Sequence, residues 1–283
     1  MAIQFLKPGL LTSLQDRGRF LGMQDGIPIS GAMDQNLLKA VNKSLGNDQD
    51  SAALEIFMQP TSLEFTKRTY FSVGAYAADL FLNKEKIDPL RAYLVEPGDV
   101  FRIQKLHKAV WSYLAVKGGF QSEEVLGSRS FHKSLHMETC KGENGFVRHE
   151  EFKGKIKRKK IEVVDLDDAN MTLKCVALPE FEHLFETVKY QLLNAEFTLS
   201  KQSNRMAYRL QERLGNNLSE ITTAAVLPGT VQLTSGGFLM ILMRDSQVTG
   251  GYPRILQLTE SSLSQLSQMR PHAQIKFELS EEF

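Results

Sequence analysis

Short apolar runs separated by turn signals dominate residues 51–120 of the chain. The segments 83–84, 96–99 and 118–119 contain Gly, Pro, Asn or Asp and can reverse the chain between the runs. The pattern predicts strands at 62–65, 70–73, 79–82, 92–95, 100–103 and 109–116. Because these strands are short and closely spaced, they favour an antiparallel sandwich or barrel over a parallel doubly wound sheet. A further strand is predicted at 2–6, before Pro8 and Gly9.

A helical period replaces this pattern in three places. Asp34 is a candidate N-cap for the first helix, and Gly46 supplies its stop. The apolar face of that helix would consist of Leu37, Leu38, Val41 and Leu45. A second helix is predicted after Pro179, with Phe181, Leu184, Phe185 and Val188 along one face. A third would carry Leu263, Leu266 and Met269.

Residues 242–255 break an apolar run into a polar turn. The run 238–243 predicts a buried strand, and apolar residues resume at Ile255. Between them, Gly250 and Gly251 carry no Cβ, so the backbone could adopt positive φ and approach a ligand. An ordinary hairpin with a Gly-Gly turn is the alternative interpretation, and the stretch alone leaves both open.

Charge and cysteine content favour some classes of partner over others. The 283 residues contain 34 Lys and Arg against 33 Asp and Glu, a net charge of +1, which indicates neither nucleic acid nor an anionic membrane as the partner. Cys140 and Cys175 lie far apart, which predicts no disulfide framework and suits a reducing cytosol. Since no apolar run approaches the roughly 18 residues of a membrane span, we expect a soluble cytoplasmic protein.

Two further patterns, a possible metal site and a possible nucleic-acid patch, also have purely structural explanations. His132, His136 and Cys140 recur every four residues and could share a helix face around a metal, but no fourth ligand is apparent, so no metal site is predicted. The basic run 153–160 could bind nucleic acid. It contains no aromatic residue, which favours a solvated linker or exposed strand.

The standard catalytic motifs are absent. The sequence contains no phosphate-binding P-loop, no strand-linked G-x-G-x-x-G, no G-x-S-x-G elbow, no H-E-x-x-H and no biotinyl-lysine site of the Met-Lys-Met type. What remains is three clusters rich in Arg, Asp, Gln, Asn and Tyr. Arginine forks bind carboxylates, and amides or phenols can polarise a carbonyl. The clusters therefore suit a small amide or carboxylate substrate, unless they only support the fold.

Taken together, the motifs resemble those of the biotin-dependent carboxyltransferase family. This family includes the C subunit of 5-oxoprolinase, also labelled allophanate hydrolase subunit 2, and the carboxyltransferase domain of urea carboxylase. The matching motifs, which span nearly the whole chain, are Gly9 through Thr12 to Gln15-Asp16-Arg17-Gly18-Arg19; Gly26, Pro28 and Gly31-Ala32-Met33-Asp34; Leu126-Gly127-Ser128-Arg129-Ser130; Ser203-Asn204-Arg205-Met206 with Tyr208-Arg209-Leu210; Leu227-Pro228-Gly229-Thr230-Val231-Gln232; and Asp245, Gln247 and Thr249-Gly250-Gly251-Tyr252-Pro253-Arg254-Ile255.

The resemblance implies a mainly β fold with a few helices. Two cyclophilin-like β-barrel subdomains, at residues 1–165 and 166–283, would surround a shared cleft, and terminal strands could cross between them. The motifs would converge on that cleft.

The resemblance also implies site residues. The catalytic set would be Gln15, Asp16, Arg205 and Asp245. Arg205 and Arg209 would hold a carboxylate or phosphorylated intermediate, and Asp16, Asp34 or Asp245 would handle protons or brace the arginines. Substrate binding would involve Arg19, Gly31, Ala32, Met33, Asp34, Asn204, Tyr208, Arg209, Gln247, Thr249, Gly250, Gly251 and Tyr252. The alternatives are a helix-capping role for Asp34 and a packing role for Tyr252.

Three functions follow from the resemblance. The first is the C subunit of an ATP-dependent 5-oxoprolinase that opens 5-oxoproline to glutamate together with A-like and B-like partner subunits; ATP would bind at the level of the complex. The second is carboxyl transfer from carboxybiotin, on a separate carrier, to a urea-like amide. The third is a non-catalytic regulatory partner of a kinase-inhibitor-like protein of the B type. Ala207, Ser246 and Val248 depart from the family pattern, and the departures at Ser246 and Val248 keep the third alternative open. A homo-oligomer is also compatible with the sequence.

Overall fold

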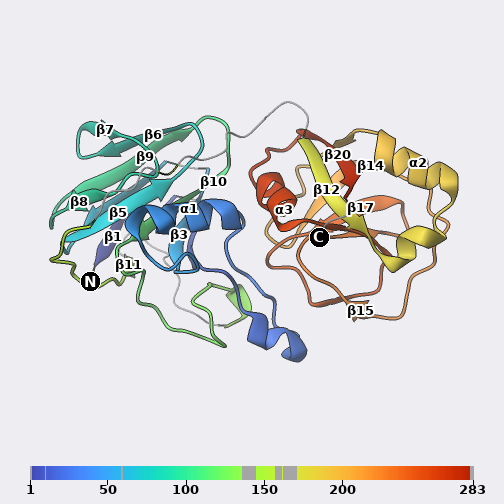
Figure 1. Cartoon of the computed structure of the whole chain (residues 1–283), viewed down its shortest axis with the longest axis horizontal. Helices are drawn as coiled ribbons and strands as arrows, with labels where there is room; N and C mark the ends of the chain where they lie inside the picture. Colours follow the sequence, from blue (N-terminus) through green and yellow to red (C-terminus); the bar gives the residue numbers. More distant parts are fainter. Residues whose placement is uncertain are drawn as a thin grey trace. The chain divides into compact units, whose positions relative to one another are not determined.

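The computed structural model describes residues 2–9, 11–58, 60–135, 145–156, 161 and 171–280. The fold is mainly β, as predicted. The chain divides into two compact units: Met1–Arg19 with Ser30–Leu166, and Phe20–Ile29 with Asp167–Phe283 (Figure 1). The predicted subdomain boundary at 165 and 166 falls outside the described residues and stays a prediction. Residues Phe20–Ile29 include the 3₁₀ helix η1 (Phe20–Asp25) and group with the second unit.

The first unit contains two antiparallel sheets. One has the order β11-β1-β4-β9-β6-β7, formed by β11 (Phe146–Val147), β1 (Ile3–Lys7), β4 (Thr61–Phe65), β9 (Val100–Leu106), β6 (Ala78–Leu82) and β7 (Glu85–Ile87). The other has the order β2-β3-β10-β5-β8, formed by β2 (Thr12–Gln15), β3 (Ala53–Phe57), β10 (Trp111–Val116), β5 (Thr69–Gly74) and β8 (Tyr93–Val95). The predicted strands are confirmed. Strand β3 was missed because Glu55 interrupts its apolar run, and β7 because it is short and charged.

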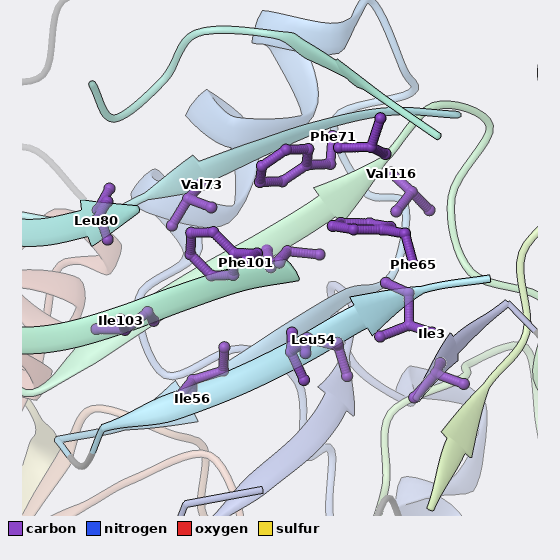
Figure 2. Packing of buried hydrophobic residues seen from close by; sticks show 14 of the residues in the cluster. Ile3, Leu54, Ile56, Phe65, Phe71, Val73, Leu80, Phe101, Ile103 and Val116 are labelled. Atoms are coloured by element: carbon purple, nitrogen blue, oxygen red, sulfur yellow. The ribbon is translucent and has the colours of Figure 1, made fainter. Parts of the chain in front are cut away.

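The core of the first unit joins residues from both sheets. Figure 2 shows Phe65, Phe71 and Phe101 packed together, with ring centroids 4.9 Å apart for Phe65 and Phe71 and 5.4 Å apart for Phe71 and Phe101. Ring pairs at this separation contribute about 0.5–1.5 kcal/mol each beyond their buried area. Alternating strand residues supply these side chains, and in β10 the opposite face, with Trp111, Tyr113 and Ala115, is buried as well.

The second unit is a nearly closed sheet. Its order is β13-β20-β12-β19-β16-β17-β14, formed by β13 (Phe197–Thr198), β20 (Gln274–Leu279), β12 (Met171–Ala177), β19 (Arg254–Leu258), β16 (Thr230–Leu233), β17 (Phe238–Leu242) and β14 (Ala207–Arg213). A bridge between Leu199 and Leu210 joins its two ends. Strands β12 and β20 are parallel, and the other described pairs are antiparallel. Joining the ends removes exposed strand edges, as in a barrel.

The hairpin interpretation of residues 242–255 is wrong. Strands β17 and β19 do not pair with each other, because β16 lies between them and pairs with both. The intervening segment instead forms the two-residue strand β18 (Thr249–Gly250), which pairs with β15 (Ala224–Ala225). The strand at 238–243 and the resumption at Ile255 are confirmed as β17 and β19.

Helix α1 (Gln35–Leu45) forms as predicted. The side chain of Asp34 accepts a hydrogen bond from the Leu37 amide at 2.9 Å, and Gly46 ends the helix in the left-handed conformation with φ 64°. Its apolar face packs against β5 and β10 (Figure 1). The capping role of Asp34 is therefore confirmed. In the second unit, α3 (Glu260–Ser267) is also confirmed, with Met269 just beyond its last residue.

The single helix predicted after Pro179 is wrong. The segment forms a 3₁₀ helix η3 (Pro179–His183) and then helix α2 (Glu186–Asn194), with extended backbone at Leu184 and Phe185. Asn217 stabilises the break between the two helices. Its side chain donates to the His183 carbonyl at 2.9 Å and accepts from the Phe185 amide at 3.3 Å. Phe185 is consequently 64% exposed rather than buried. No helix in the described part of the chain is long and apolar enough to cross a membrane.

Candidate active site

In the first unit, Asp16 anchors a turn that is distant in sequence. Its carboxylate accepts hydrogen bonds from the Gly18 amide (2.8 Å), the Arg129 amide (2.6 Å) and the hydroxyls of Ser128 (2.7 Å) and Ser130 (2.6 Å). A carboxylate offers about four lone-pair positions, and these donors use that number. The arrangement supports a bracing role for Asp16. Its predicted catalytic role stays a prediction.

Two neighbours of Asp16 bind the same part of the chain. The guanidinium of Arg19 is fully buried and donates to the carbonyls of Val125 (2.8 Å) and Ser130 (2.7 Å). The side chain of Gln15 donates to the Phe131 carbonyl at 3.2 Å and accepts from the Gly31 amide at 3.1 Å. Both residues hold the 125–131 segment against the end of β2. Both side chains are fully buried. The catalytic role predicted for Gln15 and the substrate contact predicted for Arg19 stay predictions.

The segment Gly31 to Asp34 is fixed by its backbone amides. Gly31 has φ 92°, and a Cβ there would lie 2.8 Å from the Arg17 carbonyl oxygen, so only glycine fits. The Ala32 amide donates to the Asp16 carbonyl at 2.9 Å. These contacts bring Gln15, Asp16, Gly31 and Ala32 together within the first unit. The predicted convergence of all the motifs on one cleft stays a prediction.

A buried carboxylate that sequence analysis missed completes this cluster. Glu55 lies on β3 and is fully buried, and its Oε2 atom accepts from the Met33 amide (2.7 Å) and the Tyr113 hydroxyl (2.7 Å). The Tyr113 hydroxyl also accepts from the Asp34 amide at 2.8 Å. The available signal was an acid inside the apolar run at 53–57, a position where an unpaired charge would be costly.

Two tyrosines in this cluster stay protonated donors. Burial raises the pKa of Tyr113 well above its ordinary value, and the adjacent carboxylates of Glu55 and Asp34 raise it further. Tyr76 donates to Asp34 at 3.3 Å, and burial followed by the charge of Asp34 raises its pKa as well. Each hydroxyl therefore satisfies a buried carboxylate without adding a second negative charge.

We expect Glu55→Ala to lower the free energy of unfolding by about 2–4 kcal/mol, because it leaves the Met33 amide and the Tyr113 hydroxyl buried without their acceptor. Tyr113→Phe should cost about 1–3 kcal/mol, and a double-mutant cycle should give a coupling of about 1–2 kcal/mol. Urea denaturation measures all three. Glu64→Ala is the matched control on the neighbouring sheet, since Glu64 is only half-buried and should cost under about 0.5 kcal/mol. Additive losses would contradict the shared hydrogen-bond network.

In the second unit, Arg205 and Asp245 form a bidentate ion pair. Nε of Arg205 lies 2.7 Å from Oδ2 of Asp245 and Nη2 lies 2.8 Å from Oδ1, and the side chains are 10% and 17% exposed. The Asp245 amide also donates to the Arg205 carbonyl at 2.8 Å. Thus two motifs that are 40 residues apart meet at the end of the β14–β17 pair. The role of bracing an arginine, one of those predicted for Asp245, agrees with this geometry.

The other polar residues in and just before β14 bind partners other than Asp245. The Asn204 side chain accepts from the Met206 amide at 2.7 Å and so shapes its own turn. Tyr208 is buried, and its hydroxyl donates to the Ser267 carbonyl at 3.1 Å. Arg209 lies on the opposite strand face, with its guanidinium 3.8 Å from the Phe238 ring centre and a bond to Gln202 at 2.8 Å. Tyr208 therefore supports the fold, while Arg209 remains at the surface.

The segment from Gln247 to Tyr252 is largely exposed. Gln247 and Thr249 are exposed, and Tyr252 is 38% exposed, so its binding role and its packing alternative both stay predictions. Neither Gly250 nor Gly251 has positive φ, which contradicts the turn geometry predicted for them. Gly250 is needed for a different reason: a Cβ there would lie 2.5 Å from Nε2 of Gln232.

No group of three or more His, Cys, Asp or Glu side chains in the described residues could hold a metal ion. Of the three residues weighed as zinc ligands, His136 and Cys140 lie outside those residues, as do residues 157–160 of the basic run. The two donor-rich clusters consist of carboxylates, guanidiniums, amides and phenols, and each lies within its own unit.

Comparison with known proteins agrees with the motifs. The chain is 30% identical over 271 residues to the C subunit of 5-oxoprolinase from Escherichia coli, covering 94% of this chain and 87% of that protein. It is 32% identical over 130 residues to urea amidolyase of Lachancea kluyveri, covering 46% of this chain and 7% of that protein. The crystal structure of TTHA0988 superposes with a TM-score of 0.87 at 25% identity over 98% of this chain, which spans 55% of the TTHA0988 chain.

A family model supplies the most general result. The model for the carboxyltransferase domain, subdomain A and B, matches residues 25–279, which include every site motif except the one at 9–19. The solved structure of TTHA0988, which matches over nearly the whole chain, has the same fold. The chain therefore belongs to the family of carboxyltransferase domains with subdomains A and B.

Proposed function

We propose that this protein is the C subunit of an ATP-dependent 5-oxoprolinase complex. The observation that carries the proposal is the similarity to the C subunit of 5-oxoprolinase over 94% of this chain and 87% of that protein. A match over nearly both full lengths favours the same assembly more than a match to one part of a larger enzyme does. The reaction would open the amide ring of 5-oxoproline to glutamate while ATP is hydrolysed.

The second-unit cluster is the part of this chain that would meet the substrate. Arg205 and Arg209 supply guanidinium groups that bind carboxylates, and Gln247 supplies an exposed amide. Asp245 occupies two nitrogens of Arg205, which holds the guanidinium in one orientation. In the first unit, Asp16 and Glu55 would act as positioning residues for the backbone of residues 31–34. ATP would bind on the A-like or B-like partner subunits, because this chain has no phosphate-binding motif.

The test is a reconstitution. The chain is mixed with the A-like and B-like proteins encoded beside it, and release of ADP and glutamate is measured with and without 5-oxoproline. We expect glutamate release that depends on all three proteins and on 5-oxoproline. If the two neighbours turn over equally well without this chain, the catalytic proposal fails, and a regulatory role through the B-like protein takes its place.

Carboxyl transfer is the second candidate function. The match to urea amidolyase, at 32% identity over 130 residues, favours it, since the name of that relative refers to urea. In that case carboxybiotin on a separate carrier would donate the carboxyl group to an amide-like acceptor. Bicarbonate-dependent incorporation of ¹⁴C into urea, measured with a biotinylated carrier and a biotin carboxylase, distinguishes this reaction from ring opening.

A further inference from the structure

The outer face of the six-stranded sheet in the first unit contains a basic hollow of about 480 Å³. Side chains from four strands and one turn line it. Those that bear on its chemistry are Lys7, Ser62, Phe81, Lys84, Arg102 and Gln104. They belong to the sheet of β1, β4, β9 and β6, whereas Asp16 and Glu55 belong to or adjoin strands of the other sheet. The hollow is therefore not part of the candidate active site described above.

Strand register places these side chains in one row. Lys7 pairs with Ser62, Ser62 with Arg102, and Arg102 with Phe81. Their neighbours Leu63, Phe101 and Leu80 are buried in the core, so Ser62, Arg102 and Phe81 all point outward. With strands about 4.8 Å apart, the backbones of Lys7 and Arg102 are about 10 Å apart, within reach of one small ligand between them.

The charge of the hollow is of one sign. Three cations line it and no carboxylate does. Within the described residues, Lys7, Lys84 and Arg102 have no carboxylate oxygen within 4.0 Å, whereas Lys86 on the adjacent β7 pairs with Asp79 at 3.0 Å. Arg102 donates to the Asn83 carbonyl at 2.5 Å, which orients its guanidinium beside Lys84.

We propose that this hollow binds a small phosphate-bearing anion. The Arg102 fork and the two lysines provide the positive charge, and Ser62 and Gln104 add neutral donors for phosphate oxygens. The volume exceeds that of a single phosphate, and the Phe81 ring forms an apolar wall, so a diphosphate or a phosphate attached to an organic group fits. The proposal is independent of the proposed oxoprolinase function.

Calorimetric titration of the full chain with pyrophosphate tests it. We expect saturable binding with one site that weakens between about 50 and 150 mM salt, because the lysines are solvent-exposed. Arg102→Gln and Lys84→Gln should each weaken the affinity about fivefold or more. Lys105→Gln is the matched control: it removes an exposed cation from the same strand outside the hollow, and should change the affinity less than about twofold.

Other probes define the ligand class. Tighter binding of ADP than of pyrophosphate, lost in Phe81→Ala, would assign the hollow to nucleotides, and equal binding would assign it to the phosphate groups alone. Citrate binding as tight as pyrophosphate binding would overturn the phosphate assignment. No saturation below about 10 mM pyrophosphate, or equal weakening by Lys105→Gln, would overturn the site itself.

Discussion

Arg205→Ala is expected to lower 5-oxoproline-dependent turnover of the reconstituted complex by about 100-fold or more. Removing the guanidinium deletes a candidate carboxylate-binding group and leaves the Asp245 carboxylate, only 17% exposed, without its partner. Loss of the pair should also lower the free energy of unfolding by about 1–3 kcal/mol. Initial rates of glutamate release, measured at saturating and subsaturating 5-oxoproline, separate a loss of binding from a loss of catalysis.

A second ion pair in the same unit provides the control. Arg244 is 7% exposed and pairs with both carboxylate oxygens of Glu260. Arg244→Ala should therefore destabilise the chain to a similar extent while leaving turnover of the folded complex within about threefold. Arg205→Lys retains the charge but not the fork, and should recover only part of the activity. Equal losses of turnover in Arg205→Ala and Arg244→Ala would show that stability alone explains the effect.

Asp16→Ala is expected to cost about 3–5 kcal/mol in the free energy of unfolding. The substitution removes the acceptor for two backbone amides and two serine hydroxyls, all but one of which come from residues 128–130. Hydrogen bonds to a charged acceptor are stronger than neutral ones, and the groups left behind are shielded from water. Thermal and urea unfolding would measure the loss, and hydrogen exchange should show faster exchange of the amide of Arg129.

Asp48 is the matched control for Asp16. Its carboxylate also accepts from an amide two residues later, that of Asp50 at 2.9 Å, but Asp48 is exposed and makes this one described side-chain contact. Asp48→Ala should therefore cost less than about 1 kcal/mol. A comparably small loss for Asp16→Ala would mean that water or neighbouring groups replace the carboxylate, and that the 126–130 turn is held by other contacts, chiefly those of Arg19.

Helix α1 and the strands between residues 61 and 116 could be predicted from the sequence because their signals are local. Asp34 caps the helix through an amide three residues away, and Gly46 ends it by adopting a left-handed conformation one residue past its end. In the strands, alternating apolar residues mark the face that enters the core. Such contacts involve residues only a few positions apart. The sequence pattern therefore predicts these elements without knowledge of the rest of the fold.

The candidate site depended on contacts between distant parts of the chain. Motif resemblance indicated which segments belong together, but not that the Asp16 carboxylate would be enclosed by donors up to 114 residues away, or that Arg19 would be fully buried. Glu55 could not be assigned from its run because its partners are the amide of Met33 and the hydroxyl of Tyr113. A buried polar group is stable only where a partner arrives, and local sequence does not specify which distant residue that is.

The same reason accounts for the errors at residues 181–188 and 242–255. A helical period continues through Leu184 and Phe185, yet Asn217 supplies hydrogen bonds on both sides of the break and replaces those of a continuous helix. Two apolar runs around a Gly-Gly pair look like a hairpin, yet β16 pairs with both strands and the glycine makes room for Gln232. Periodicity and capping chemistry thus identify the elements, while pairing partners and buried polar contacts arise only when the chain folds, because they depend on distances that sequence spacing does not encode.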